Sequence, residues 1–256
     1  MARLRRVRSH AAWPLLALLC IFSAPAAAPT AEQAAREARA AIDQAQYDRG
    51  KSIIDDALKR FGSSEDETIW SLRVMRAQVF HVRGDQEAVL RELEKELPPA
   101  LRTSDPAVRR LITLANAKIA LNERNEAMQR LQQARAIAEK HHPALLGEIY
   151  AAMAIAAPTI RDVEEYAHKA IAVAKQNADR RVEARAMATL LYRSVGAGRY
   201  GDAIQWGEKA LVITQSQKFE RATQQIFVNM GWAYAELAST KPRQNCLPLL
   251  RRLPRA

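Results

Sequence analysis

A pattern of small and apolar residues recurs five times along this chain, at intervals of 36 to 40 residues. The copies begin at Gly50, Val89, Ala127, Val163 and Ala203. In each copy an apolar or small residue follows four positions later, and alanine follows three positions after that in every copy except the second. Steps of three and four residues mark one face of an α-helix. A fixed period of this length is typical of solenoids built from stacked helical units.

A second helical segment precedes each copy, and a turn separates the two halves. The residue about twelve positions before each start is small in four copies and leucine in the fifth; these residues are Ala38, Ala77, Ala115, Ala151 and Leu191. The turn-like stretches between the halves are 46–48, 83–85, 122–124, 158–159 and 198–200. Each unit is therefore predicted to be a pair of antiparallel helices.

Proline and glycine positions agree with this prediction. Four internal prolines fall between units, where helices must end because proline lacks the backbone N–H; they are Pro98, Pro99, Pro106 and Pro143. The chain has only 9 glycines in 256 residues. An all-β chain of this length needs many more glycine-containing turns, so we expect helices nearly throughout residues 32–240.

The pattern resembles the tetratricopeptide repeat (TPR), whose helix A carries Leu-Gly-x-x-Tyr and whose helix B carries Ala-x3-Phe-x2-Ala. A sixth helix A matches best, with Met230 at the leucine position, Gly231 at the small position and Tyr234 at the aromatic position. The resemblance implies an all-α, right-handed α-solenoid of about five and a half repeats, or eleven helices. Several aromatic positions hold alanine or serine, so another α-solenoid or an irregular helical bundle is the alternative.

The resemblance also predicts where helices touch and where the solenoid ends. Gly231 and Ala115 take the small position, so we expect a larger residue at either to strain the fold. The sixth helix A, about 221–237, is followed by Pro242 and Pro248 and so has no helix B. We therefore expect its apolar side chains to be partly exposed and the protein to self-associate; these side chains are Phe227, Met230 and Tyr234.

TPR domains bind peptides or proteins along a concave face lined by helix A. The outward-facing positions of that helix carry over to a candidate partner-binding set: Gln78, His81, Arg109, Asn116, Glu148, Arg185, Tyr192, Gln225 and Trp232. We expect binding energy to concentrate on Tyr192 and Trp232, because aromatic residues are common hot spots. Each residue of the set has an alternative interpretation as an ordinary exposed side chain.

One TPR subclass holds a C-terminal carboxylate with a clamp of lysine, asparagine and arginine. Asn116 occupies an asparagine position of that clamp, but Ile112 stands where the lysine belongs. Binding of chaperone C-terminal tails is therefore not implied.

Motifs for catalysis, cofactors or metals are weak. Residues 196–201 read Gly-Ala-Gly-Arg-Tyr-Gly and match the dinucleotide fingerprint, but a helical run at 187–195 precedes them where that fingerprint needs a strand. We interpret them as a turn. The histidines lack metal-ligand spacing, and Cys246 has no histidine neighbour and is interpreted as a spectator thiol. We predict no enzyme activity, no cofactor and no metal.

The formal charge of +11 is concentrated at the two ends of the chain. Four arginines precede residue 27 and five basic residues follow residue 240, with no acidic residue in either segment. Without these nine, 30 basic residues face 28 acidic ones. A body so nearly neutral has no overall field that attracts a polyanion, so we predict that nucleic acid is not a partner.

The N-terminus resembles a Sec-type signal peptide, with a basic region, an apolar run at 15–22 and small residues at 23–28. We predict cleavage after Ala26, or else after Ala28, and export to the periplasm or beyond. The alternatives are an uncleaved anchor, acylation at Cys20, and a twin-arginine signal. The apolar run is shorter than the roughly 20 residues that span a bilayer, which disfavours an anchor.

These observations divide the chain into a signal peptide at 1–26, a linker at 27–31, a TPR-like solenoid at 32–240 and a basic tail at 241–256. We predict that the tail is disordered. The predicted function is a non-enzymatic scaffold that binds a protein or an extended peptide. The alternative is a truncated regulatory or substrate-docking segment of a larger exported enzyme, such as a CHAT-type protease or a sensor kinase.

Overall fold

The structure is a computed structural model that describes residues 29–240. Eleven α-helices and two short 3-10 helices make up this part of the chain, with no strand among them. The odd-numbered helices are α1 (Ala31–Asp43), α3 (Glu67–Val82), α5 (Asp105–Ala120), α7 (Leu146–Ala156), α9 (Arg180–Gly196) and α11 (Glu220–Thr240). The even-numbered helices are α2 (Tyr47–Phe61), α4 (Gln86–Leu93), α6 (Arg124–His141), α8 (Ile160–Gln176) and α10 (Tyr200–Ser216).

Local sequence fixes where these helices begin and end. At the start of α1 the Thr30 hydroxyl accepts a hydrogen bond from the backbone N–H of Gln33, and the Gln33 side-chain oxygen accepts one from the backbone N–H of Thr30. The Asp66 side chain caps α3 by accepting from the backbone N–H of Ile69 at 2.9 Å. The turn after α9 needs a left-handed residue and has Gly198 there, with φ of 72°. The five predicted turns all lie between an odd-numbered helix and the next even-numbered one.

Consecutive helices pack as antiparallel pairs, and each pair packs against the next. Each odd-numbered helix also contacts the next odd-numbered helix along the whole series. Within residues 29–240 no comparably broad contact joins successive even-numbered helices. The odd-numbered helices therefore lie on the inner side of the curve, where neighbouring units converge, and the even-numbered ones lie outside. The prediction of an α-solenoid of antiparallel helix pairs is confirmed.

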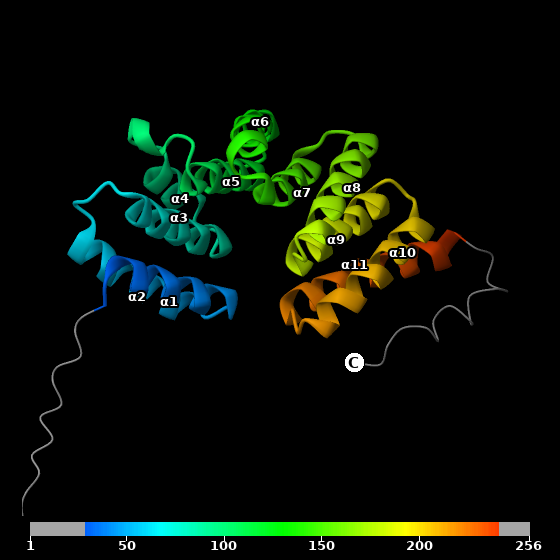
Figure 1. The fold of residues 1–256 in the computed structure, drawn as a ribbon. Coiled ribbons are helices and arrows are strands. Elements are labelled where there is room, and N and C mark those ends of the chain that lie inside the picture. The colour runs from blue at the N-terminus through cyan, green and yellow to red at the C-terminus, as the bar shows by residue number, and fades with distance from the viewer. Residues whose placement is uncertain (1–28, 241–256) are drawn as a thin grey trace, which may run out of the picture.

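The units form an arc (Figure 1), and a side-chain contact links the first unit to the fifth. Arg181, at the start of α9, donates to the Asp43 carboxylate at 3.5 Å and to the Asp43 carbonyl at 3.2 Å, across 138 residues of sequence. The Arg181 guanidinium also lies over the Phe219 ring, 5.4 Å from its centroid. The inner face of the arc is therefore a strongly curved surface rather than a flat groove.

Five separate apolar clusters fill the seams between the helices. Four of the predicted small residues are fully buried in these seams, including Ala115, which confirms them as packing positions. The largest cluster joins α7 to α11. The chain thus builds its core from local contacts between neighbouring units, as a repeat protein does.

Two expectations about α11 are wrong. Met230 is only 3% exposed and Tyr234 only 6%, because both pack into the cluster shared with α9 and α10. Phe227, by contrast, is partly exposed as expected, and it packs against the edge of that cluster. Gly231 is not a point of close helix contact, since a Cβ added there would meet none of the described atoms within 4 Å.

Candidate functional site

Side chains from successive odd-numbered helices join into a polar strip along the inner face. Arg109 on α5 donates to Asp105 at 2.7 Å and to Glu148 on α7 at 2.9 Å. Arg185 on α9 donates to the backbone carbonyl of Glu148 at 3.1 Å. Three residues of the sequence-predicted set, Arg109, Glu148 and Arg185, thus belong to one network that crosses three units.

The strip continues onto α1 and α3 through a residue that the sequence analysis missed. Arg39 on α1 donates to Gln78 on α3 at 3.4 Å. Arg39 could have been identified from the repeat pattern, because it follows the small residue Ala38 just as Gln78 follows Ala77. A rule that selects the residue after each small position would have included Arg39.

The three arginines of the strip differ in how their charge is compensated. Burial lowers the pKa of Arg39 and of Arg185. Burial acts in the same direction on Arg109, but Glu148 and Asp105 outweigh it, so the pKa of Arg109 is raised. Among the described residues, neither Arg39 nor Arg185 forms an ion pair with a carboxylate. The middle of the strip is therefore neutralised internally, and the arginines on either side are not.

The two predicted hot-spot residues line a single pocket. Tyr192 on α9 is 58% exposed and Trp232 on α11 is 56% exposed, which places both among the few large apolar side chains that face solvent. They border a cavity of about 640 Å³, together with residues from the turns between odd- and even-numbered helices. We call this cavity the aromatic pocket; its principal residues are Arg124, Ile160, Tyr192, Arg193, Trp232 and Glu236.

Arg193, another residue that the sequence analysis missed, is held in place at the wall of the aromatic pocket. It donates to the carbonyl of Ala157 at 3.0 Å and to that of Pro158 at 3.4 Å, at the end of α7. Burial, and then the like charge of Arg124, lower the pKa of Arg193. On α11, Trp232 donates from its indole nitrogen to Glu236 at 3.2 Å. The pocket thus combines two aromatic rings with two nearby guanidinium groups.

The remaining predicted residues are not brought together. His81 lies near the end of α3, with its Nδ1 atom 2.8 Å from the Gln86 side-chain oxygen. Asn116 is half-buried on α5, and Gln225 is exposed in the first half of α11. None of these three residues lines the aromatic pocket, and no hydrogen bond joins them to one another within residues 29–240.

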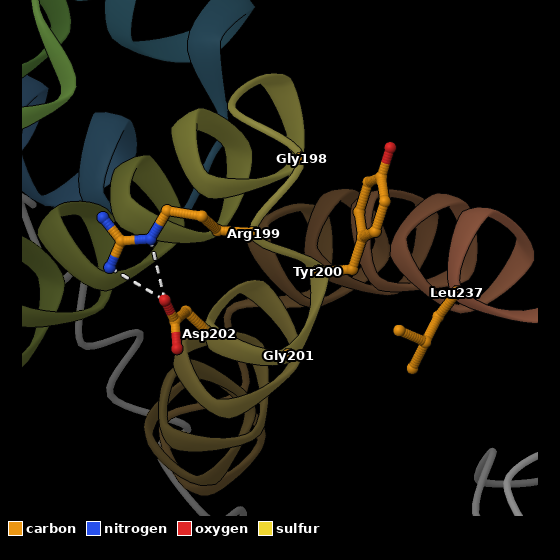
Figure 2. A pocket seen from close by; sticks show the side chains of 6 residues that line it. All are labelled: Gly198, Arg199, Tyr200, Gly201, Asp202 and Leu237. Atoms are coloured by element: carbon orange, nitrogen blue, oxygen red, sulfur yellow. Dashed lines mark hydrogen bonds and ion pairs between the residues drawn. The ribbon is translucent and has the colours of Figure 1, made fainter. Parts of the chain in front are cut away.

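The Gly-Ala-Gly-Arg-Tyr-Gly segment covers the last residue of α9, the turn at 197–199 and the first two residues of α10. Figure 2 shows Arg199 directed toward Asp202, with Nε to Oδ2 at 2.8 Å, and Leu237 of α11 across a small cavity of about 430 Å³. The element before the segment is a helix, not the strand that a dinucleotide site requires. The interpretation as a turn is confirmed.

Residues 29–240 contain neither a metal-binding cluster nor a helix suited to a bilayer. Their histidine, cysteine, aspartate and glutamate side chains form no group of three or more that could hold a metal ion. No helix among them combines the length and the apolar character needed to cross a membrane. Cys246, the predicted signal peptide at 1–26 and the tail at 241–256 lie outside the described residues.

Comparisons with known proteins identify similar solved structures only. No protein-family profile matches the chain, and no curated protein matches it. The crystal structure of a single-substitution variant of a Podosopora anserina protein, described as a kinesin light chain with nearly identical TPR-like repeats, is 17% identical, with a TM-score of 0.48, and covers 74% of this chain and 96% of its own. A second structure of that description, without the substitution, is 15% identical, with a TM-score of 0.38, and covers 82% of this chain and 96% of its own.

Proposed function

We propose that this chain is a non-enzymatic scaffold that binds a protein or an extended peptide along the inner face of its arc. The observation that carries the proposal is the set of polar contacts between inner helices, where Arg39 donates to Gln78 and both Arg109 and Arg185 donate to Glu148. Beside them, on α9 and α11, Tyr192 and Trp232 stand exposed. Rigid polar positions beside exposed aromatic anchors are the usual make-up of a protein interface.

The charges of this face support a binding role rather than a catalytic one. Asp105 and Glu148 are both engaged by Arg109, and Asp202 is engaged by Arg199. These carboxylates are therefore taken up by ion pairs within the chain and are not presented to a substrate.

Site-specific crosslinking tests which face binds. A photoreactive phenylalanine analogue replaces Tyr192 on the inner face or, as the matched control, Val212, which is 70% exposed on the outer helix α10. The full chain is then illuminated with a displayed library of random twelve-residue peptides. We expect the Tyr192 position to recover crosslinked peptides at least tenfold more often than the Val212 position.

Equal recovery from the two positions would contradict binding along the inner face. Absence of recovery from both would contradict the scaffold function itself. The control is matched because both side chains are exposed and each lies in the second half of a helix of the same unit.

We also propose that the chain is exported and loses residues 1–26. The basic, apolar and small-residue regions of its N-terminus support this proposal. We expect N-terminal sequencing of the protein from a bacterial envelope fraction to read from Ala27. A sequence that begins at Met1 or Ala2 in the membrane fraction would instead indicate an uncleaved anchor.

A further inference from the structure

We propose that the aromatic pocket binds an acidic segment of a partner protein, with a carboxylate between Arg124 and Arg193 and an apolar side chain against Tyr192 and Trp232. The inference rests on the proposed scaffold function and specifies the chemistry of the partner. It follows from the charges that surround the pocket, from the exposed apolar area inside it and from the orientation of three helices.

Arginines at the pocket lack the carboxylate partners that other charged residues nearby have. Glu123 and Glu126 flank Arg124 in sequence, but both pair with Lys118, at 2.6 and 3.0 Å. Within residues 29–240, no carboxylate lies within ion-pair distance of Arg124 or Arg193. The pocket therefore presents positive charge that the local acidic residues do not cancel.

The other acidic residues near the pocket already interact with groups of this chain. Glu164 and Asp202 pair with Arg199 in the turn beside the pocket. Glu236 lines the pocket and accepts from the Trp232 indole at 3.2 Å. It is the acidic residue among the lining side chains, and it leaves two guanidinium groups against one carboxylate.

The first residues of three helices line this same pocket. They are Arg124 of α6, Ile160 of α8 and Tyr200 of α10. The N-terminal end of an α-helix carries a partial positive charge, which favours an anion nearby. The helix ends thus add to the field of the two guanidinium groups, although Asp162 and Asp202 in the first turns of α8 and α10 reduce their contribution.

The apolar part of the ligand follows from the exposure of the two rings. Tyr192 and Trp232 are more than half exposed at the border of a cavity of about 640 Å³. Aromatic rings that are left in contact with water beside a cavity gain free energy when an apolar side chain covers them. An acidic segment with a neighbouring apolar residue would compensate the charge of the two guanidinium groups and would cover the two aromatic rings.

A peptide selection with defined variants tests the inference. A displayed library of random twelve-residue peptides is selected on the full chain, and the bound pool is sequenced. We expect enrichment of aspartate and glutamate next to large aliphatic or aromatic residues. An enriched peptide is then titrated by fluorescence anisotropy, together with an analogue in which glutamines replace its glutamates and asparagines replace its aspartates.

The arginine variants distinguish binding in the pocket from general electrostatic attraction of the peptide to the protein. We expect Arg124→Gln to weaken the acidic peptide about tenfold or more, because a charge-assisted hydrogen bond is lost. The neutral analogue should bind both proteins equally weakly. Arg36→Gln, which removes an exposed arginine of α1 that does not line the pocket, should leave the affinity unchanged. Arg193→Lys keeps the charge and is expected to retain most of the binding.

The apolar contact has its own matched pair on α11. Trp232→Ala should weaken the same peptide at least tenfold, whereas Val228→Ala, which alters a 66% exposed residue outside the pocket, should not. Far-ultraviolet circular dichroism of each variant shows whether it remains folded. Equal effects of Arg124→Gln and Arg36→Gln would overturn the inference.

Other outcomes distinguish this inference from the scaffold proposal. A pool without acidic enrichment that still crosslinks at position 192 leaves the scaffold function standing and overturns the acidic partner. Displacement of the peptide by an equal concentration of a single-stranded oligodeoxynucleotide would show that the pocket recognises phosphate, and would also overturn it. Failure to select any peptide would contradict both the scaffold function and the acidic partner.

Discussion

Replacing Trp70 with alanine is expected to lower the free energy of unfolding by about 3 kcal/mol. Trp70 lies on α3, is 1% exposed and packs with Leu97 and Ala107 at the joint between the second and third units. Truncation of a buried tryptophan leaves a cavity and typically costs about 3 to 5 kcal/mol. Its indole nitrogen is buried without a hydrogen-bond partner among the described residues, so its removal recovers part of that cost.

Trp232→Ala is the matched control for this prediction, because it makes the same chemical change at a position that is 56% exposed. We expect it to change the stability by less than about 0.5 kcal/mol, as surface substitutions usually do. Urea unfolding followed by circular dichroism measures both variants without relying on tryptophan fluorescence. Similar destabilisation by the two substitutions would show that the burial of Trp70 is not what stabilises this joint.

A leucine at Gly207 is expected to destabilise the protein by about 1 to 3 kcal/mol through overpacking. Gly207 lies on α10, where an added Cβ would stand 2.5 Å from both the Cγ and the Sδ atoms of Met230 on α11. The methionine side chain must move, and it is itself buried in the largest core cluster. Thermal melting and urea unfolding would both show the loss.

Gly231→Leu serves as the control, since the space around that glycine is open within the described part of the chain. Leucine is also a better helix former than glycine by up to about 1 kcal/mol, so we expect this variant to be unchanged or more stable. Adding Met230→Ala to Gly207→Leu should recover part of the loss by making room for the leucine. If the double variant loses the sum of the two single effects, Met230 is not the residue that resists the leucine.

Helix pairs and turns could be predicted from the sequence because they depend on local spacing. Apolar residues at steps of three and four fix the buried face of each helix, and residues such as Gly198 and Asn122, both with positive φ, mark the turns. The apolar spacing recurs in every unit, and a residue with positive φ lies at the turn of every unit except the fourth. An ambiguous copy could therefore be interpreted with the help of a clear one.

The curvature of the arc and the details of α11 could not be predicted in this way. The contact between Arg181 and Asp43 depends on small rotations that accumulate over four units, and no single position encodes them. The repeat pattern marks Gly231 as a small position but does not show whether a neighbouring helix reaches it. Gly207, which does meet a neighbour, stood in the pattern as one apolar position among others.

For the candidate site, the repeat pattern predicts positions but not the partners of the side chains there. Arg109 and Glu148 were selected as separate exposed residues, whereas the structure shows that they pair with each other. Arg193 and Arg124 come from different units and meet only because the turns of the third and fifth units lie along one edge. Pairing between units depends on the stacking geometry, which a one-dimensional pattern does not contain.

The division of the core into five clusters has a consequence for how such a chain can change its length. Each cluster draws on neighbouring helices, and the Arg181 to Asp43 contact is a surface link rather than a part of any cluster. A unit can therefore be duplicated or deleted with new packing required only at the two seams beside it. The residues that shape the inner face can diverge from unit to unit, while the alanines of the seams keep successive units interchangeable.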